Sequence, residues 1–553
     1  MKKFIAHILL ISLSFFTLKS SAQVDSTWTE KIDSLFINWN TPNHPGGAVA
    51  VMKDGKMIFS RAYGMASLEY LVPNSTGTIF NTGSVSKQFT AMGIVRLEEE
   101  GKLSFDDDIH KYIPELPDFG ETITIRHLLH HTSGLRSLHA LFALAGWRGD
   151  DSRTNEDLNR IILNQNALNF KPGSEFLYCN SGYMLMVNIV EKITGEKFKD
   201  WMKDNIFDEL NMSSTYVEDQ YSRVVPNNAT SYYGKSDFDR AVEYWGYVGS
   251  GNMHSTTNDL LKWLSNFNEP QPGWESSFKK MQTIDPLKDG SENNYAFGVF
   301  VNEHLGRKRI GHGGAIGGFR ASIATYPTEN LNIVVLTNFS AGNPGGNSNN
   351  IAEIILGSNN VKKSKEGVTN NITLSTDQLK RFEGQYWNER EKYSRKIYLK
   401  NDTLRYSRSK NNENPVIPIS DNVFRMLNVA ANLLITFEKK KGVNQMSVSV
   451  GKQSPSIFNQ IIDLDVSKAE LSEYVGQYYS SEVETTYRIS IKSDSIQIYH
   501  PRHGAIPLEP LFQDILKGSW PIGSVEIGRD SNEKVSGIFI SNGRVRNAWF
   551  KKQ

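Results

Sequence analysis

A serine and a lysine three residues apart are the first residues in this sequence that could do chemistry together. They lie in Thr82-Gly83-Ser84-Val85-Ser86-Lys87, ahead of apolar residues at helical spacing. On a helix this spacing puts Lys87 on the same face as Ser84, one turn above it. A serine hydroxyl becomes an effective nucleophile when a base takes its proton, and lysine is such a base once its pKa is lowered. Alone, the pair is weak evidence, because a helix cap followed by an exposed lysine has the same pattern.

A tyrosine and an asparagine add to this pair. Tyr178 and Asn180 lie two residues apart in the stretch Lys171–Tyr183. We expect the Tyr178 hydroxyl to lie near Lys87 and to exchange protons with Ser84 and the leaving group. The Asn180 amide is expected to hold Lys87 and a substrate carbonyl. Cys179, between them, is expected to point away as a small buried residue.

A glycine-rich segment supplies the third element. His312, Gly313, Gly314 and Ala315 precede a predicted strand. Glycines allow backbone to approach a ligand closely. We therefore predict that the Ala315 N–H, together with the Ser84 N–H at the start of its helix, forms an oxyanion hole.

The elements that must position these residues follow from local patterns. Two strands flank the turn Asp54-Gly55, which is a strong hairpin signal, and a second strand pair lies far along the chain. Helical segments lie between the two pairs. One sheet built from both ends, with an inserted helical part, is the expected arrangement. The predicted strands are Ala48–Lys53, Lys56–Ala62, Arg320–Tyr326 and Leu331–Asn338, and the clearest helices are Gln88–Glu100 and Asp259–Phe267.

The rest of the chain is predicted to be almost entirely strand, and it repeats itself. Residues 379–387 match residues 471–479 at an offset of 92 residues, through Gly-Gln-Tyr and the apolar positions around it. A duplicated β-module is the natural interpretation, and closure of each copy into a small barrel would remove its edges. The predicted class is α+β. Its parts are a catalytic domain (24–358), a polar linker (359–375) and two barrel-like domains (376–465 and 466–553).

Composition excludes several functions. The chain has 553 residues, with 61 Lys and Arg against 60 Asp and Glu, so it lacks a broad basic field for nucleic acid. Its single cysteine excludes an intramolecular disulfide and a cysteine-rich metal site. His127, His130 and His131 are spaced like metal ligands, but no local carboxylate or cysteine completes a set. We predict no metal and no cofactor.

The amino-terminal residues are typical of a secretory signal peptide. Lys2 and Lys3 precede the apolar run Phe4–Leu18, and small residues follow up to Ala22. Cleavage after Ala22 would remove residues 1–22 and leave a periplasmic or secreted protein. The alternative, a membrane anchor, would need a longer apolar run. No later segment of the sequence is long and apolar enough to span a membrane.

Together and in this order, Ser84-x-x-Lys87, Tyr178-x-Asn180 and His312-x-Gly314 resemble the serine β-lactamase and penicillin-binding-protein superfamily, over roughly residues 30–355. The Tyr-x-Asn form is similar to the class C branch. The resemblance implies a mixed antiparallel sheet packed on helices, with the active site between the sheet and a helical part. It implies that Ser84 attacks, that Lys87 and Tyr178 move protons, and that His312 contacts substrate or tunes Tyr178.

The chain departs from the family at His312-Gly313-Gly314, where many members have Lys-Thr-Gly. That lysine helps to bind a substrate carboxylate, whereas histidine is mostly neutral at pH 7 and Gly313 has no hydroxyl. We therefore expect weak binding of carboxylate-bearing β-lactams and of peptides ending in D-Ala-D-Ala. The His312-x-Gly314 form resembles that of bacterial D-aminopeptidases and of related esterases. The D-aminopeptidases also carry two β-barrel domains.

Three hypotheses remain from the sequence. The first is a secreted serine hydrolase that acts through a Ser84 acyl-enzyme on a small molecule or short peptide. Its substrates would be peptide amides, as in D-aminopeptidases, or esters; a β-lactamase or D-Ala-D-Ala carboxypeptidase is the alternative. The second is a penicillin or wall-fragment receptor without turnover. The third is a binding scaffold whose β-modules do the work, which the intact catalytic set argues against. The modules are expected to dock against the cleft, and the sequence leaves the oligomeric state open.

Overall fold

The computed structural model describes residues 26–357, 371–409, 412–429, 433–450, 454–461 and 468–553. The predicted signal peptide and most of the predicted linker lie outside the described residues, as does the predicted boundary between the two barrel-like domains. Within the described ranges, no helix is both long enough and apolar enough to span a membrane.

A six-stranded antiparallel sheet organises the first part of the chain, as the sequence predicts. β1 pairs with β13, so strands from the two ends of this region lie side by side. The β1–β2 turn is Asp54-Gly55, and both residues have positive φ. In sheet order the strands are β10 (Phe300–His304), β11 (Arg307–Ile316), β12 (Phe319–Tyr326), β13 (Leu331–Thr337), β1 (Gly47–Lys53) and β2 (Lys56–Tyr63).

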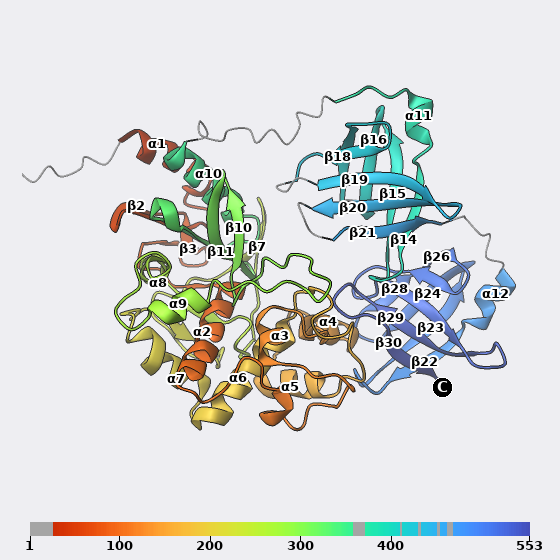
Figure 1. The fold of residues 1–553 in the computed structure, drawn as a ribbon, viewed down its shortest axis with the longest axis horizontal. Coiled ribbons are helices and arrows are strands. Elements are labelled where there is room, and N and C mark those ends of the chain that lie inside the picture. Colours follow the sequence, from red (N-terminus) through yellow and green to blue (C-terminus); the bar gives the residue numbers. More distant parts are fainter. Residues whose placement is uncertain (1–25, 358–370, 410–411, 430–432, 451–453, 462–467) are drawn as a thin grey trace, which may run out of the picture.

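Helices cover both faces of this sheet (Figure 1). Alternate side chains of a strand point to opposite faces. Val49 and Val51 accordingly join one apolar cluster, whereas Ala48 and Ala50 join another. The first cluster includes residues of α1 and α10, and the second includes residues of α2, α6 and α8. The helices are α1 (Ser26–Ser34), α2 (Ser86–Glu99), α3 (Ile125–Leu129), α4 (Leu138–Leu144), α5 (Asn155–Leu163), α6 (Asn180–Thr194), α7 (Phe198–Met202), α8 (Thr257–Ser265), α9 (Glu275–Lys280) and α10 (Pro344–Leu356).

Short strands complete this region. They form a three-stranded sheet, β5-β9-β6, and two two-stranded sheets, β3-β4 and β7-β8. Their bounds are β3 (Met65–Ser67), β4 (Val72–Pro73), β5 (Phe80–Asn81), β6 (Tyr216–Val217), β7 (Tyr232–Gly234), β8 (Phe238–Arg240) and β9 (Met253–Ser255).

The first β-module closes into a barrel of eight strands, β14 to β21. The short helix α11 (Thr376–Lys380) precedes it. Its strands are β14 (Gly384–Asn388), β15 (Tyr393–Lys400), β16 (Thr403–Ser409), β17 (Asn412–Pro418), β18 (Val423–Met426), β19 (Leu433–Lys440), β20 (Val443–Val450) and β21 (Ser456–Gln460).

The second β-module is a nine-stranded sheet whose two end strands, β25 and β26, are joined by Leu508 alone. The ends of the sheet therefore lie close together, and the module is nearly closed. Its strands are β22 (Gly476–Ser480), β23 (Thr485–Lys492), β24 (Ser495–His500), β25 (Gly504–Pro507), β26 (Glu509–Phe512), β27 (Ile515–Lys517), β28 (Ser524–Arg529), β29 (Val535–Ser541) and β30 (Ala548–Lys552).

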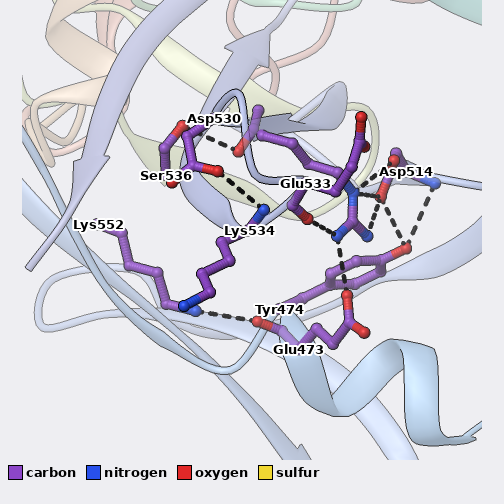
Figure 2. Close-up of polar contacts among 10 residues, drawn as sticks. Glu473, Tyr474, Asp514, Asp530, Glu533, Lys534, Ser536 and Lys552 are labelled. Carbon is purple, nitrogen blue, oxygen red and sulfur yellow. Dashed lines mark hydrogen bonds and ion pairs between the residues drawn. The ribbon is translucent and has the colours of Figure 1, made fainter.

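The predicted repeat is visible in matching contacts. Tyr386 donates a hydrogen bond to the Phe382 carbonyl at 2.9 Å, and Tyr478 donates to the Tyr474 carbonyl at 2.6 Å. In each copy a buried tyrosine thus ties the first strand to the turn that follows the preceding helix. In the second copy, polar contacts add to this link where α12 (Lys468–Glu473) meets the sheet (Figure 2). There Tyr474 donates to Asp514, and Lys552 donates to the Glu473 carbonyl.

The second module packs directly against the helical part of the first region (Figure 1). One apolar cluster runs from α4 and α6 into the module, and Tyr487 donates to the Leu144 carbonyl at 2.9 Å. Arg136 and Glu482 form an ion pair across this boundary, with both side chains buried. This docking brings a loop of the module to the end of the sheet where the predicted site lies.

Candidate active site

Ser84 and Lys87 lie where the sequence predicts, at the start of the helix that packs under the sheet. Ser84 is in a single 3-10 turn, Gly83–Val85, which leads directly into α2. The Lys87 Nζ is 3.2 Å from the Ser84 Oγ and donates to the Ser250 carbonyl at 2.7 Å. Ser84 itself is partly exposed, whereas Lys87 is fully buried. The Lys87 amine is therefore shielded from water, while the Ser84 hydroxyl can reach the cleft.

The environment of Lys87 favours its neutral form. Burial lowers its pKa well below the usual range, and the positive charge of Arg544 lowers it further. An amine with a depressed pKa can accept the Ser84 proton at neutral pH. The sequence indicates that Lys87 needs a lowered pKa, but only the structure shows the burial that lowers it.

Tyr178 lies beside Lys87, and the contact between the two is with the tyrosine ring. The Lys87 Nζ is 4.8 Å from the centre of the Tyr178 ring. Burial raises the pKa of Tyr178, while the Ser84 hydroxyl opposes that shift, so the phenol keeps its proton at neutral pH. A protonated tyrosine beside the nucleophile can donate to a departing group.

The two neighbours of Tyr178 in the sequence have different outcomes. Cys179 is buried and its thiol donates to the Leu135 carbonyl at 3.3 Å, which confirms the expectation that it points away. Asn180 begins α6 and lines the cleft. Among the described residues, however, Lys87 hydrogen-bonds Ser84 and the Ser250 carbonyl and not Asn180. The Ser250 carbonyl takes the place predicted for the amide, so Asn180 is left to face the substrate space.

His131, one of three histidines with metal-like spacing, packs on the Tyr178 ring instead. Their ring centres are 4.2 Å apart, and the His131 Nδ1 accepts the Cys179 N–H at 3.1 Å. Burial lowers the pKa of His131 well below its usual value, and the charge of Lys87 adds to the effect. A neutral imidazole here fixes the backbone next to Tyr178. Among the described residues, no group of three or more His, Cys, Asp or Glu side chains could hold a metal ion.

His312 acts as a neutral acceptor. Its Nδ1 donates to the Gly313 carbonyl at 2.5 Å, which leaves the lone pair on Nε2. That Nε2 lies 3.1 Å from the Tyr295 hydroxyl and 3.5 Å from the Tyr178 hydroxyl. Burial, helped by the nearby Lys87 charge, lowers the pKa of His312 to about 3. It therefore provides no positive charge for a substrate carboxylate at neutral pH.

The end of β11 lies directly against the Ser84 turn. β10 pairs with β11 only as far as Gly311, so among the described residues the edge from His312 onward has no strand partner on that side. The contact needs two glycines. A Cβ on Gly314 would stand 1.9 Å from the Thr82 carbonyl oxygen, and one on Gly83 would stand 2.6 Å from the Ala315 nitrogen. This close approach brings the backbone at Ala315 to the Ser84 turn, as an oxyanion hole requires.

These residues line one cleft of about 770 Å³. All eight predicted site residues except Lys87 line it, and Lys87 lies buried directly behind Ser84. The cleft also includes Arg320 of β12 and Arg544, which comes from the loop between β29 and β30 of the second module.

Three contributors to the site escape the sequence patterns: the Ser250 carbonyl, Tyr295 and Arg544. Ser250 contributes its backbone carbonyl, and a backbone acceptor has no residue-type signal. Tyr295 belongs to none of the three motifs, and only the fold brings its hydroxyl to the His312 Nε2. Arg544 has no local signal, because only the docking of a separate module places it here.

Comparison with known proteins is consistent with this geometry. The model of the family described as Beta-lactamase matches residues 33–357, more than half of the chain. A D-aminopeptidase of Gluconobacter oxydans (strain 621H) is 28% identical over 296 residues, covering 53% of this chain and 56% of the relative. A penicillin-binding protein of Bacillus subtilis (strain 168) is 28% identical over 327 residues, covering 56% of this chain and 71% of the relative.

A solved structure shares the fold over a longer stretch. The octameric penicillin-binding protein homologue from Pyrococcus abyssi has a TM-score of 0.54 and 24% identity, covering 79% of this chain and 99% of that one. The alignment with the D-aminopeptidase spans only about half of that relative's length.

Proposed function

This chain belongs to the Beta-lactamase family, and from that premise we propose that it is a serine hydrolase acting on peptide amides or esters through an acyl-enzyme at Ser84. The observation that carries the proposal is the 3.2 Å contact between the Ser84 Oγ and the Nζ of Lys87, a buried lysine with a depressed pKa. A nucleophile beside a base that is neutral at working pH is what acyl transfer requires.

The steps follow from the arrangement. Ser84 attacks the substrate carbonyl and passes its proton to Lys87, and the Oγ–C bond forms. The N–H groups of Ser84 and Ala315 hold the oxyanion. The bond to the leaving group then breaks, and Tyr178 donates a proton to that group. Lys87 passes the proton that it took from Ser84 on to Tyr178. A water molecule then attacks the Ser84 acyl-enzyme ester. Its proton passes through Tyr178 and Lys87 to the Ser84 Oγ as the ester bond breaks, which releases Ser84.

His312 and Asn180 position the reacting groups. The neutral His312 Nε2 accepts from Tyr295 at 3.1 Å and lies 3.5 Å from the Tyr178 hydroxyl, so it helps to orient Tyr178. Asn180 lines the cleft beside Ser84 and is available to a substrate carbonyl. Gly313 and Gly314 keep the open edge of β11 free for substrate backbone.

The test is a panel hydrolysed by purified protein lacking residues 1–22, with Ser84→Ala as the blank. The panel comprises D-Ala and L-Ala p-nitroanilides, a short p-nitrophenyl ester and a chromogenic cephalosporin. We expect turnover of at least one amide or ester, together with a covalent mass increase on the Ser84 peptide in the wild type alone. Equal turnover by Ser84→Ala would refute the proposal. A stable adduct without turnover would favour the receptor hypothesis instead.

We also propose that the chain is exported after cleavage behind Ala22, from the basic and apolar pattern of its first residues. Amino-terminal sequencing of the protein recovered from the periplasm or medium should begin at Gln23. Recovery of uncleaved protein in the membrane fraction would favour the anchor.

A further inference from the structure

The cleft has an unusual charge balance for a site that would read a free amino group. Among the described residues that line it, none is Asp or Glu, whereas two are arginines, Arg320 and Arg544. The hollow next to it, of about 570 Å³, shares Arg320 and adds Arg148 and Arg153, again without a lining carboxylate. Arg148 is paired with Asp150 and Glu243 lies near Arg320, so the cation of the cleft without a nearby carboxylate is Arg544. Among the lining residues a substrate ammonium would meet no carboxylate, whereas a substrate anion would be attracted to Arg544.

Arg544 is the cation that is free to bind. Its Cζ lies 5.1 Å from the centre of the Tyr178 ring, and its side chain is exposed to the cleft. Within the described ranges, no carboxylate lies within ion-pair distance of its guanidinium. Arg320, by contrast, already donates to the Gly317 and Phe319 carbonyls.

The backbone of Arg544 is held from both sides, so its side chain starts from a fixed point. Its carbonyl accepts from the Ser137 N–H at 3.2 Å and from the Asn169 side chain at 3.1 Å. The next residues are anchored by Arg136, whose guanidinium donates to the Arg546 carbonyl at 2.8 Å and the Asn547 carbonyl at 3.1 Å. An anchored loop loses little freedom when its side chain binds a ligand, which favours affinity.

The position of Arg544 over the Tyr178 ring indicates which part of the substrate this arginine would contact. Tyr178 is the proposed donor to the leaving group, so a cation stacked on its ring lies on the leaving-group side of the scissile bond. Guanidinium groups bind carboxylates through paired, charge-assisted hydrogen bonds. Neutral His312 stands where many family members carry a lysine, and an arginine from a different module supplies the missing charge.

We propose that Arg544 of the second β-module is a specificity-determining residue that selects substrates whose leaving group carries a carboxylate. This inference rests on the proposed function and names its substrate class. It reverses the expectation from His312-Gly313-Gly314 that carboxylate-bearing substrates bind weakly.

The experiment compares matched substrates that differ only in this charge. The first pair is N-acetylalanyl lactate and its lactamide, in D,D and L,L forms, and the second is a cephalosporin and its carboxylate ester. The two pairs distinguish a linear terminus from a ring carboxylate. The readout is the ratio of kcat/KM within each pair. A mutation that changes the pKa of Lys87 affects both members of a pair equally, so that effect cancels in the ratio.

For the wild type we expect the carboxylate member of at least one pair to be preferred by about 10- to 100-fold, the range for hydrogen bonds to charged groups. Arg544→Ala should bring that ratio close to one, Arg544→Glu should invert it, and Arg544→Lys should keep part of it. Arg488→Ala is the control, because it removes an exposed arginine of the same module that stacks on Tyr499 instead. A wild-type ratio near one in both pairs, or a ratio that Arg544→Ala leaves unchanged, would overturn the proposal.

A binding measurement separates this inference from the proposed function. If no substrate of the earlier panel or of these two pairs shows Ser84-dependent turnover, the proposed function fails. Calorimetric Kd values for Ser84→Ala and for Ser84→Ala with Arg544→Ala then decide about Arg544. Preferential binding of the carboxylate that vanishes in the double variant supports the inference, and equal Kd values for the two ligands refute it.

Discussion

Arg136 of the family domain and Glu482 of the second β-module form an ion pair in which the exposed fractions of the side chains are 2% and 0%. The same arginine donates to the Arg546 and Asn547 carbonyls, in the loop that carries Arg544. One buried side chain therefore links the docking of the module to the composition of the active site.

Breaking this pair should destabilise the protein strongly. Removal of one partner leaves the other charge buried and uncompensated, which costs about 3–5 kcal/mol. We expect Glu482→Gln to lower the free energy of unfolding by that amount in urea titrations. The matched control is Arg160→Gln, which breaks the exposed ion pair with Glu484 across the same boundary and should cost less than about 1 kcal/mol. Similar losses in the two variants would contradict the assigned role of burial.

Lys87→Met should inactivate the protein while stabilising it. Loss of the base should lower kcat/KM by about 10²- to 10⁴-fold. The unfolded chain protonates Lys87 at pH values below about 10.5, whereas burial opposes protonation in the folded chain. The wild type therefore loses stability relative to Lys87→Met as the pH falls from that value towards the depressed folded pKa. Lys56→Met, in the exposed β1–β2 hairpin, should change neither property, and equal stability of Lys87→Met and wild type across this pH range would argue against a depressed pKa.

The acidic limb of the pH–rate profile should depend on Arg544. Its positive charge helps to keep the pKa of Lys87 low, so Arg544→Ala should raise that pKa. A smaller fraction of Lys87 is then neutral at a given pH, and the limb should move to higher pH for neutral substrates also. Arg544→Lys keeps the charge and should leave the limb near its wild-type position. A limb that stays in place in Arg544→Ala would mean that Lys87 does not set it.

Gly313 and Gly314 should differ sharply in their tolerance of a side chain, although they are neighbours in β11. A Cβ on Gly313 meets only the Ala321 carbonyl oxygen at 3.6 Å, an ordinary contact, whereas one on Gly314 would stand 1.9 Å from the Thr82 oxygen. We expect Gly313→Ala to change the free energy of unfolding little. Gly314→Ala should cost about 1–3 kcal/mol and displace the Ser84 turn, which would also reduce acylation. Thermal unfolding and acylation rates of the two variants check this, and equal tolerance would show that β11 does not press on that turn.

Tyr178→Phe should impair amides more than activated esters. A p-nitrophenolate leaves without a proton, whereas an amine must receive one from Tyr178. We therefore expect kcat for an anilide or peptide amide to fall by about 10²-fold or more, with a smaller loss for the p-nitrophenyl ester. Tyr247→Phe removes a hydroxyl that lines the same cleft but faces His139, and it should spare both activities. Equal losses on both substrate types in Tyr178→Phe would refute its role in leaving-group protonation.

Much of this protein could be predicted from local sequence, because the relevant forces act over a few residues. The Asp54-Gly55 turn, the α2 segment and the β12–β13 pair follow from turn chemistry and from apolar periodicity. The spacing of Ser84 and Lys87 on one helix start determines that they meet, and the duplicated Gly-Gln-Tyr stretch predicts two similar β-modules. These features need no knowledge of what packs against them.

What only the tertiary structure decided concerns contacts between segments that are far apart in the chain. The Ser250 carbonyl, and not Asn180, holds Lys87, and Tyr295 shares the His312 Nε2 with Tyr178. One of the two arginines that line the cleft is Arg544, which lies 460 residues beyond Ser84 in the numbering and reaches the cleft by docking of the second module. No local sequence pattern predicts that Arg544 lies in the cleft, because docking of the module depends on the complementarity of two folded surfaces. The proposed nucleophile and base were thus determined by residues three apart, whereas the arginine proposed to meet the substrate was placed by the fold.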